Sequence, residues 1–153
     1  MKVAELEGAL LDYWVAQHDP RCAGLTFEWR GDHWVGIGDV DGQKHVCCVG
    51  CAPSFKAKQG MRRLYREFEF FQPSCSWVDG GPIIARNNIT LLDPNYCNSG
   101  QWEAYMGAFP DVRDDRVVGM VAAGAGPTPL IAAMRSYVAS RFADHVPDIE
   151  KPL

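Results

Sequence analysis

The chain has 153 residues, 47% of them hydrophobic and 22% charged, and its formal net charge is −4. This length and composition predict one globular domain over residues 1–153, and no apolar run approaches the ~20 residues that a membrane helix needs. The net charge argues against a uniformly basic surface for nucleic acid, while a local basic patch stays open. Glu5, Glu7 and Asp12 interrupt the segment in which a signal peptide must be apolar, so we expect a cytoplasmic protein with no membrane partner.

The first predicted element is a helix over residues 3–17. Its apolar and aromatic residues fall on one helical stripe, which favours packing against a core over ligand binding. Asp19-Pro20 is expected to end this helix. From residue 25 to residue 51 the hydrophobic period changes to two, which predicts a β-hairpin or meander with strands within 26–50 and a turn at 39–42. The helical stripe consists of Val3, Leu6, Leu10, Tyr13, Trp14 and Gln17.

Residues 52–70 combine basic and aromatic side chains. This composition is typical of surfaces that bind single-stranded nucleic acid through phosphate pairing and stacking. Glu67 and Glu69 dilute the positive charge, however, and no RNA-binding signature is present. We therefore expect a solvated segment that elaborates the region 25–70, and nucleic acid is not the expected partner. The basic residues are Lys56, Lys58, Arg62, Arg63 and Arg66, and the aromatic ones are Phe55, Tyr65, Phe68, Phe70 and Phe71.

The central segment SWVDGGPIIARNNITLLDP, residues 76–94, contains a predicted turn at Asp79-Gly80-Gly81-Pro82. Further strands are predicted at 89–93, 102–106 and 117–122. Runs of strands thus lie between two terminal helices, without alternation of strands and helices. This order predicts an α+β fold in which the N- and C-terminal helices pack on one mainly antiparallel sheet.

The stretch GAGPTPLIAAMR, residues 124–135, leads into the C-terminal helix, predicted over 129–143. Thr128 is a favourable N-cap, and Pro129 follows at the first helical position, where a missing N–H costs nothing. The glycines have two explanations: they stop a strand and direct the helix, or they leave helix N–H groups free to bind an anion. The tail, residues 144–153, is expected to fray.

Six cysteines raise the question of a metal site: Cys22, Cys47, Cys48, Cys51, Cys75 and Cys97. Cys48-Val-Gly-Cys51 has the spacing of a zinc knuckle, but a closed zinc site needs four ligands and no second pair is present. We therefore expect no metal and no cofactor, and cysteines that act as small buried residues. The scattered histidines and the lack of any catalytic motif favour a binding protein without catalytic residues over an enzyme.

Two glycine-bearing segments and nearby side chains form the candidate binding site. The hypothesis is that the 77–81 turn, the 124–129 loop and Arg86 converge on one pocket for a small anionic, nucleotide-like ligand. Trp77 would offer a stacking face, glycines a close backbone approach, and Arg86 or Arg135 a bidentate anion contact. The alternative is that the glycines only form turns, that Trp77 packs in the core and that the arginines are solvated. The candidate site residues are Trp77, Asp79, Gly80, Gly81, Arg86, Gly124, Gly126 and Thr128.

Three blocks resemble a phage and prophage family known as domain of unknown function 2591, which includes NinX of lambdoid phages. These blocks are ELEGALLDYWVA, PSCSWVDGGPIIARNNITL and GPTPLIAAMRSYVAS, in the family's order. Ala85 stands where the family pattern has an acidic residue, and the cysteines of the region 45–51 are outside the pattern. The resemblance implies a small protein of the host bacterial cytoplasm but supplies no activity.

Three functions therefore stay open. The first is a non-enzymatic accessory protein that binds a small anionic ligand and thereby sequesters a host immune signal, which would be a counter-defence role. The second is a protein that binds and inhibits a host factor. The third, implied by the resemblance to NinX, is a nucleic-acid or recombination accessory protein. Self-association into a homo-oligomer is compatible with each of the three.

Overall fold

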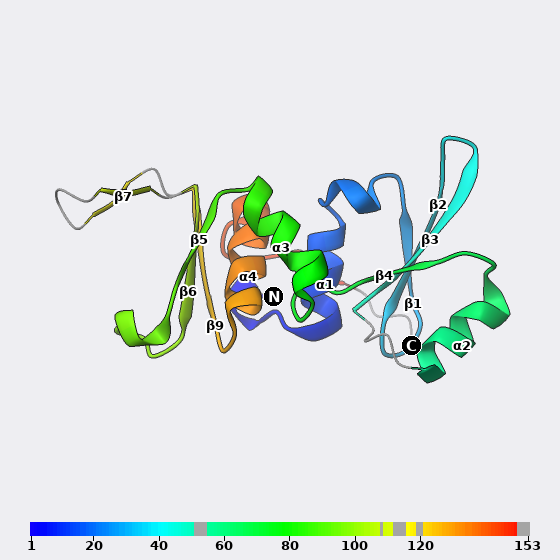
Figure 1. Cartoon of the computed structure of the whole chain (residues 1–153), viewed down its shortest axis with the longest axis horizontal. Coiled ribbons are helices and arrows are strands. Elements are labelled where there is room, and N and C mark those ends of the chain that lie inside the picture. Colours follow the sequence, from blue (N-terminus) through cyan, green and yellow to red (C-terminus); the bar gives the residue numbers. More distant parts are fainter. Residues whose placement is uncertain (51–54, 108, 112–115, 119–120, 150–153) are drawn as a thin grey trace. The chain divides into compact units, whose positions relative to one another are not determined.

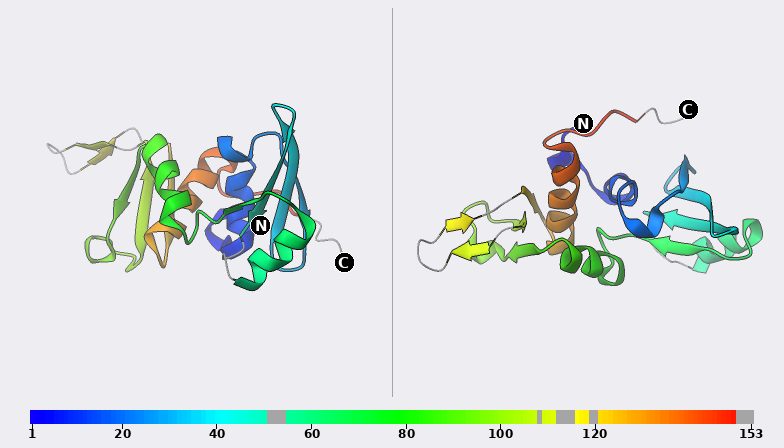
Figure 2. Two further views of the ribbon diagram at one scale, coloured as in Figure 1. Left: turned by 45° about the vertical axis from the view of Figure 1, so that its right-hand side comes forward. Right: turned by 90° about the horizontal axis from the view of Figure 1, so that it is seen from above.

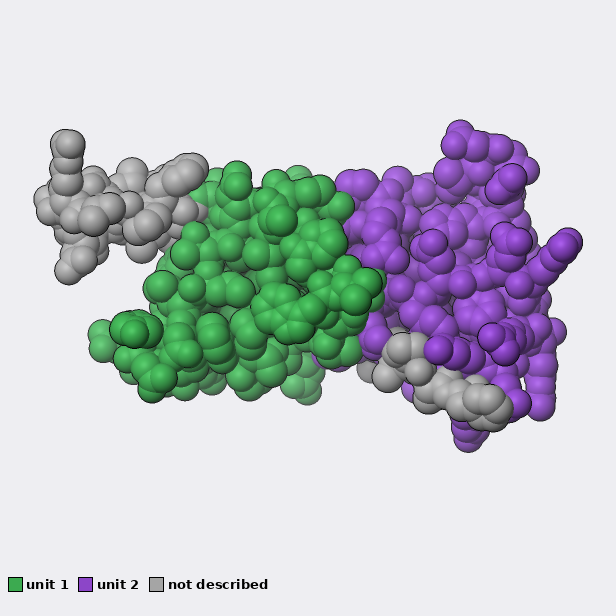
Figure 3. Space-filling view, viewed as in Figure 1, with its two compact units in different colours: residues 1–7, 73–148 green, residues 8–72, 149–153 purple. Residues whose placement is uncertain are grey.

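The computed structural model describes residues 1–50, 55–107, 109–111, 116–118 and 121–149. Its elements confirm the α+β class, with helices packed on mostly antiparallel sheets. The chain forms two compact units, one of residues 1–7 and 73–148 and the other of residues 8–72 and 149–153 (Figure 3). We call them unit 1 and unit 2. One domain over the whole chain stays a prediction.

Unit 2 contains a four-stranded sheet in the order β1-β2-β3-β4 (Figure 1). Its first three strands form the predicted antiparallel meander, and β3 pairs in parallel with β4 after a crossover through the helix α2. The turn between β2 and β3 is tight because Asp41 and Gly42 both adopt positive φ. The elements are α1 (Gly8–Ala16), η2 (Pro20–Cys22), β1 (Thr26–Trp29), β2 (Trp34–Val40), β3 (Gln43–Val49), α2 (Phe55–Leu64) and β4 (Glu69–Phe71).

The two faces of this sheet carry different hydrophobic clusters, because side chains alternate along each strand. On one face Val35, Val46 and Cys48 are buried with Met61 of α2. Residues of the opposite parity carry the other cluster, in which Trp34 packs against Tyr13 of α1 with ring centroids 4.2 Å apart. Each face of the sheet is thus covered by a different helix.

Unit 1 contains a three-stranded antiparallel sheet in the order β5-β6-β9. Helices α3 and α4 lie on one side of it, and α4 contacts all three strands (Figures 1 and 2). A short ladder of β7 and β8 belongs to the same unit. The elements are η1 (Val3–Glu5), α3 (Trp77–Arg86), β5 (Ile89–Leu92), η3 (Pro94–Tyr96), β6 (Trp102–Met106), β7 (Phe109–Asp111), β8 (Arg116–Val118), β9 (Ala122–Gly126) and α4 (Pro129–Phe142).

The prediction of one continuous N-terminal helix over 3–17 is wrong. The segment forms the 3-10 turn η1 and then, after a break, α1, which begins at Gly8 with φ +53°. That positive φ is a conformation that an α-helix cannot continue. The predicted stripe also fails, because Leu11 and Val15 are fully buried while Leu10 is half-buried.

The prediction of a single sheet is wrong as well, because the strands of 26–50 pair only within unit 2. The predicted strand 117–122 is two strands, β8 and β9, and β9 extends through the expected glycine loop to Gly126. The predicted turn at 79–82 is also wrong, since these residues lie inside α3 with Pro82 in the helix. Burial of Ile83 and Gly80 against the rest of unit 1 stabilises a helix that the glycines disfavour locally. Within the described ranges, no helix is long and apolar enough to cross a membrane.

Candidate functional site

Helix α4 starts as predicted, since the Thr128 side chain accepts a hydrogen bond from the Ile131 N–H and Pro129 is the first helical residue. Its packing on the sheet depends on small residues. A Cβ atom on Gly124 would lie 2.4 Å from both the Ala132 carbonyl oxygen and the Ser136 amide nitrogen. Such a distance is far below van der Waals contact, so only glycine allows α4 to lie this close to β9. Gly124 thus neither ends a strand nor opens the helix N-terminus, because it lies inside β9 and permits close packing of α4, a use that neither sequence-based explanation named.

Arg135 projects from α4 past the free edge of β9. Its Nε donates to the Leu6 carbonyl at 2.9 Å, and its Nη1 donates to the Ala125 carbonyl at 2.8 Å. Burial lowers the pKa of Arg135, and the charge of Glu7 acts in the opposite direction. An arginine still keeps its charge at neutral pH. Both acceptors are neutral carbonyls, and no carboxylate within the described part of unit 1 forms a salt bridge with this guanidinium.

The edge of β9 also offers backbone donors. The Ala125 carbonyl accepts from Arg135 and therefore points away from β6. In an antiparallel strand the N–H and C=O of one residue point to the same side, and residues two apart share that side. The N–H groups of Ala125 and Ala123 hence face outward along this edge. Ala123 is exposed and Ala125 is half-buried, so both are open to solvent or ligand.

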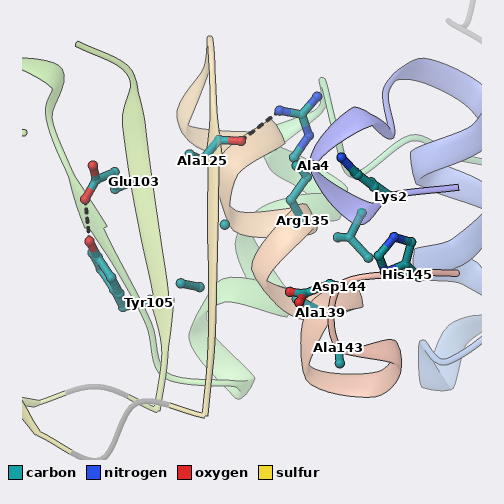
Figure 4. A pocket seen from close by; sticks show the side chains of 13 residues that line it. Lys2, Ala4, Glu103, Tyr105, Ala125, Arg135, Ala139, Ala143, Asp144 and His145 are labelled. Carbon is teal, nitrogen blue, oxygen red and sulfur yellow. Dashed lines mark hydrogen bonds between the residues drawn. The ribbon is translucent and has the colours of Figure 1, made fainter. Parts of the chain in front are cut away.

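A pocket of about 470 Å³ wraps around this edge (Figure 4). Arg135, Lys2 and His145 bring positive or protonatable groups to it, and the last two are exposed. Small residues of β9 and of the C-terminal half of α4 leave the space open. The lining residues are Lys2, Val3, Ala4, Glu103, Tyr105, Ala123, Gly124, Ala125, Arg135, Ala139, Ala143, Asp144 and His145.

Glu103 and Tyr105 bring an acceptor and an aromatic ring to the same pocket. Both side chains point away from α4 because they alternate on β6 with the buried Ala104 (Figure 4). The Tyr105 hydroxyl donates to Glu103, and the Ser99 hydroxyl donates to the other carboxylate oxygen at 2.8 Å. These bonds lower the pKa of Glu103, and the bond to Glu103 raises the pKa of Tyr105 to about 12. Glu103 is thus a charged acceptor and Tyr105 a neutral phenol at neutral pH.

Of the predicted site residues, only Gly124 lines this pocket. Gly80 packs against α4, since a Cβ atom there would lie 2.7 Å from Leu130 Cδ2, so the first turns of α3 and α4 adjoin. Trp77, the first residue of α3, is 56% exposed rather than packed in the core. The 77–81 segment thus contacts α4 through Gly80 and Leu130, while the convergence of 77–81, 124–129 and Arg86 on one ligand pocket stays a prediction.

The remaining predicted site residues are distributed around these helices. Asp79 is buried in the first turn of α3, and Gly81 has open space around its Cα. Arg86 is nine residues along α3 from Trp77, which is about 13–14 Å at the rise of a helix. Gly126 is buried and packs against the Ile131 side chain, whereas Thr128 is used as the helix cap. A ligand that contacts both Trp77 and Arg86 would have to span the length of α3.

The cysteines lie in different environments. Cys48 is fully buried in β3, while Cys51 lies outside the described residues. The hydrogen bond between Cys22 and Cys47, together with burial, raises the pKa of Cys22. In the described segments, no group of three or more His, Cys, Asp or Glu side chains is arranged to hold a metal ion.

The sequence carries a weak signal for this pocket. It indicates Arg135 as a potential anion contact, but it does not indicate Lys2, Tyr105 or His145. They come from three distant parts of the chain, and no local motif relates them. Only the pairing of the N-terminal segment with residues 144–146 brings Lys2 and His145 together.

The comparison with known families covers residues of both units. The family model described as Bacteriophage P22, NinX matches residues 2–141. The chain belongs to this phage NinX family. It is therefore a phage-encoded accessory protein, and the resemblance inferred from the three sequence blocks is confirmed. A search of curated proteins finds no match. Ala85, where we expected a family acidic residue, is exposed on α3.

Proposed function

We propose that this NinX-family protein is a non-enzymatic binding protein for a small anionic, nucleotide-like ligand, held in the pocket at the β9 edge. The observation that carries the proposal is Arg135. Its guanidinium is partly buried, oriented by two backbone carbonyls, and paired with no carboxylate within the described part of unit 1. Glu7 acts on this charge without forming a salt bridge, and an anion bound in direct contact would stabilise the desolvated guanidinium further.

The other lining groups favour a nucleotide-like ligand over a simple anion. Lys2 and the outward N–H groups of β9 add donors for a phosphate, while Tyr105 adds a ring for stacking. The Glu103 carboxylate repels a bare anion but accepts hydrogen bonds from hydroxyl or amino groups. A nucleotide carries both kinds of group, so this mixed lining matches it. The pocket volume of about 470 Å³ is in the range of small-molecule sites.

In an infected cell, a phage protein with this property would sequester a nucleotide signal that the host makes against infection. The proposal requires no chemical step on the ligand. Its biological effect would scale with the amount of protein and with its affinity, because sequestration is stoichiometric. The affinity would come from the charged contacts of Arg135 and Lys2 together with the ring of Tyr105.

The test is native mass spectrometry of the freshly purified protein, followed by thermal-shift measurements with linear and cyclic nucleotides. We expect a bound phosphorus-containing ligand, or a stabilising shift with at least one nucleotide. Ala123→Glu adds a negative charge at the exposed edge of the pocket and should abolish the shift. Ala85→Glu, the same change on exposed α3, is the matched control and should retain it. Equal loss of the shift in both variants, or no nucleotide binding at all, would contradict the proposal.

A further inference from the structure

The basic segment of unit 2 has a distinct arrangement that the proposed function does not use. Residues 56–66 contain five Lys or Arg residues and no acidic residue. In the structure, all five side chains are exposed, four of them on α2 and Arg66 just beyond it. The five are Lys56, Lys58, Arg62, Arg63 and Arg66.

Helical geometry places these charges opposite the packed face of α2. At 100° per residue, the four cations of the helix span one side, while Met61 projects from the other side. Met61 is 5% exposed and packs with Val35 and Cys48 on the sheet. The cations therefore form a continuous solvent-facing strip, which we call the α2 basic strip.

The acidic residues that dilute this charge in the sequence do not neutralise it in the structure. Glu69 lies on β4, where its carboxylate contacts Arg21 at 3.7 Å and His45 at 3.4 Å. No carboxylate in the described segments forms a salt bridge with any cation of the α2 basic strip. A row of unneutralised cations of this kind attracts a polyanion.

An apolar pocket of about 380 Å³ opens beside the strip, between α2 and the sheet. Val35, Cys48, Met61 and Leu64 contribute apolar surface, and Tyr65 contributes a ring. Arg30, Asp32, His33 and Lys56 also line it. Arg30 pairs with Glu28 at 2.7 Å and His33 pairs with Asp32, so among these four Lys56 is the cation that forms no salt bridge within the described segments. A nucleic-acid base, which has apolar faces and follows a phosphate chain, matches this combination.

We propose that unit 2 binds single-stranded nucleic acid, with phosphates along the α2 basic strip and one base in the adjoining pocket. A single strand fits because its bases are free to leave the stack, whereas those of a duplex are paired. An anionic membrane fits less well, because an interfacial helix must insert its apolar face and Met61 of α2 is buried on the sheet.

The experiment is fluorescence anisotropy of the whole protein with a labelled oligothymidylate of about 20 nucleotides. Its oligouridylate counterpart distinguishes RNA from DNA, and a duplex of the same length and phosphatidylserine vesicles are the comparison ligands. We expect single strands of at least one kind to bind more tightly than the duplex, and no binding to vesicles. The logarithm of the association constant should fall with that of the salt concentration, by roughly 0.7 per phosphate contacted.

Two variants test the two parts of the proposed surface. Arg62→Glu should weaken binding by about tenfold or more and reduce the salt slope, because it removes a phosphate contact and adds repulsion. Arg141→Glu, an exposed residue of unit 1 with the same change in charge, should leave both unchanged. Gly60→Leu should fill the pocket mouth and weaken binding by about tenfold without changing the salt slope. Ala85→Leu on exposed α3 is its control.

Three results would overturn the proposal: no binding at low salt, equal weakening by Arg62→Glu and Arg141→Glu, or binding to duplex or vesicles at least as tight as to single strands. Circular dichroism spectra of each variant would establish that the fold is retained. This test is independent of the pocket proposed for a nucleotide in unit 1, because Ala123→Glu should leave the binding of single strands unchanged.

Discussion

Replacement of Gly124 by alanine tests the closest approach between helix and sheet in unit 1. The added Cβ would lie 2.4 Å from two backbone atoms of α4, whereas ordinary contacts begin at 3.4 Å, so α4 must move by about 1 Å. A displacement of this size forfeits a quarter to a half of the dispersion energy of the contacts that it opens. Because backbone atoms cannot rotate aside, we expect a loss of about 3 kcal/mol, the upper end for overpacking.

The assay is urea unfolding followed by tryptophan fluorescence and circular dichroism, with thermal melting as a second measure. A loss of about 3 kcal/mol should lower the melting temperature by roughly 6–12 °C for a chain of this size. Gly81→Ala is the matched control, because it lies inside α3 with open space around it. This control should stabilise the protein by about 0.5–1 kcal/mol. A Gly124→Ala variant as stable as the wild type would refute the close-packing explanation of the glycine-rich stretch.

Three further predictions follow from burial and hydrogen bonding. Tyr105→Phe should destabilise the protein by about 1 kcal/mol at pH 7, because it removes a partly buried hydrogen bond to the Glu103 carboxylate. The difference from wild type in urea unfolding should vanish as the pH falls through the lowered pKa of Glu103, because the stabilisation exists only above it. Iodoacetamide at pH 8 should label the exposed Cys75 in the folded protein but Cys22 only after denaturation, because hydrogen bonding and burial raise the pKa of Cys22. Peptide mass mapping measures the labelling of each cysteine, and equal labelling of both in the folded protein would contradict the prediction. Trp77→Ala should cost about 1 kcal/mol or less in urea unfolding, because the side chain is 56% exposed; a loss of 3–5 kcal/mol would indicate a core residue.

The sequence by itself determined where some helices and turns begin, through capping and turn residues. The Thr128 cap and Pro129 define the start of α4 at the predicted residue, and the Asp41-Gly42 turn joins β2 and β3 as the alternating pattern predicts. The cap and the turn each involve only residues a few positions apart in the chain, so packing against distant segments does not alter them. The α+β class followed from the order of these elements.

Tertiary structure decided what each glycine does. Gly80, Gly81 and Gly124 are equally suited to a turn and to a close approach between elements, and sequence cannot distinguish these uses. Gly80 lies against Leu130 and is helical, Gly81 follows it in the same helix, and Gly124 lies against Ala132 and Ser136 within a strand. The partner that selects the conformation lies in another element.

The candidate site likewise depends on contacts between segments that are distant in the sequence. Arg135 is one of fifteen basic residues in the sequence, and the sequence names it only as one of two alternative anion contacts, with Arg86. Its importance arises from the carbonyls of Leu6 and Ala125, which orient and desolvate it from two other segments of the chain. The α2 basic strip was visible as a composition, but whether its charges were neutralised depended on Glu69 pairing elsewhere. Composition shows which charges a chain contains, and only packing decides which of them remain available to a ligand.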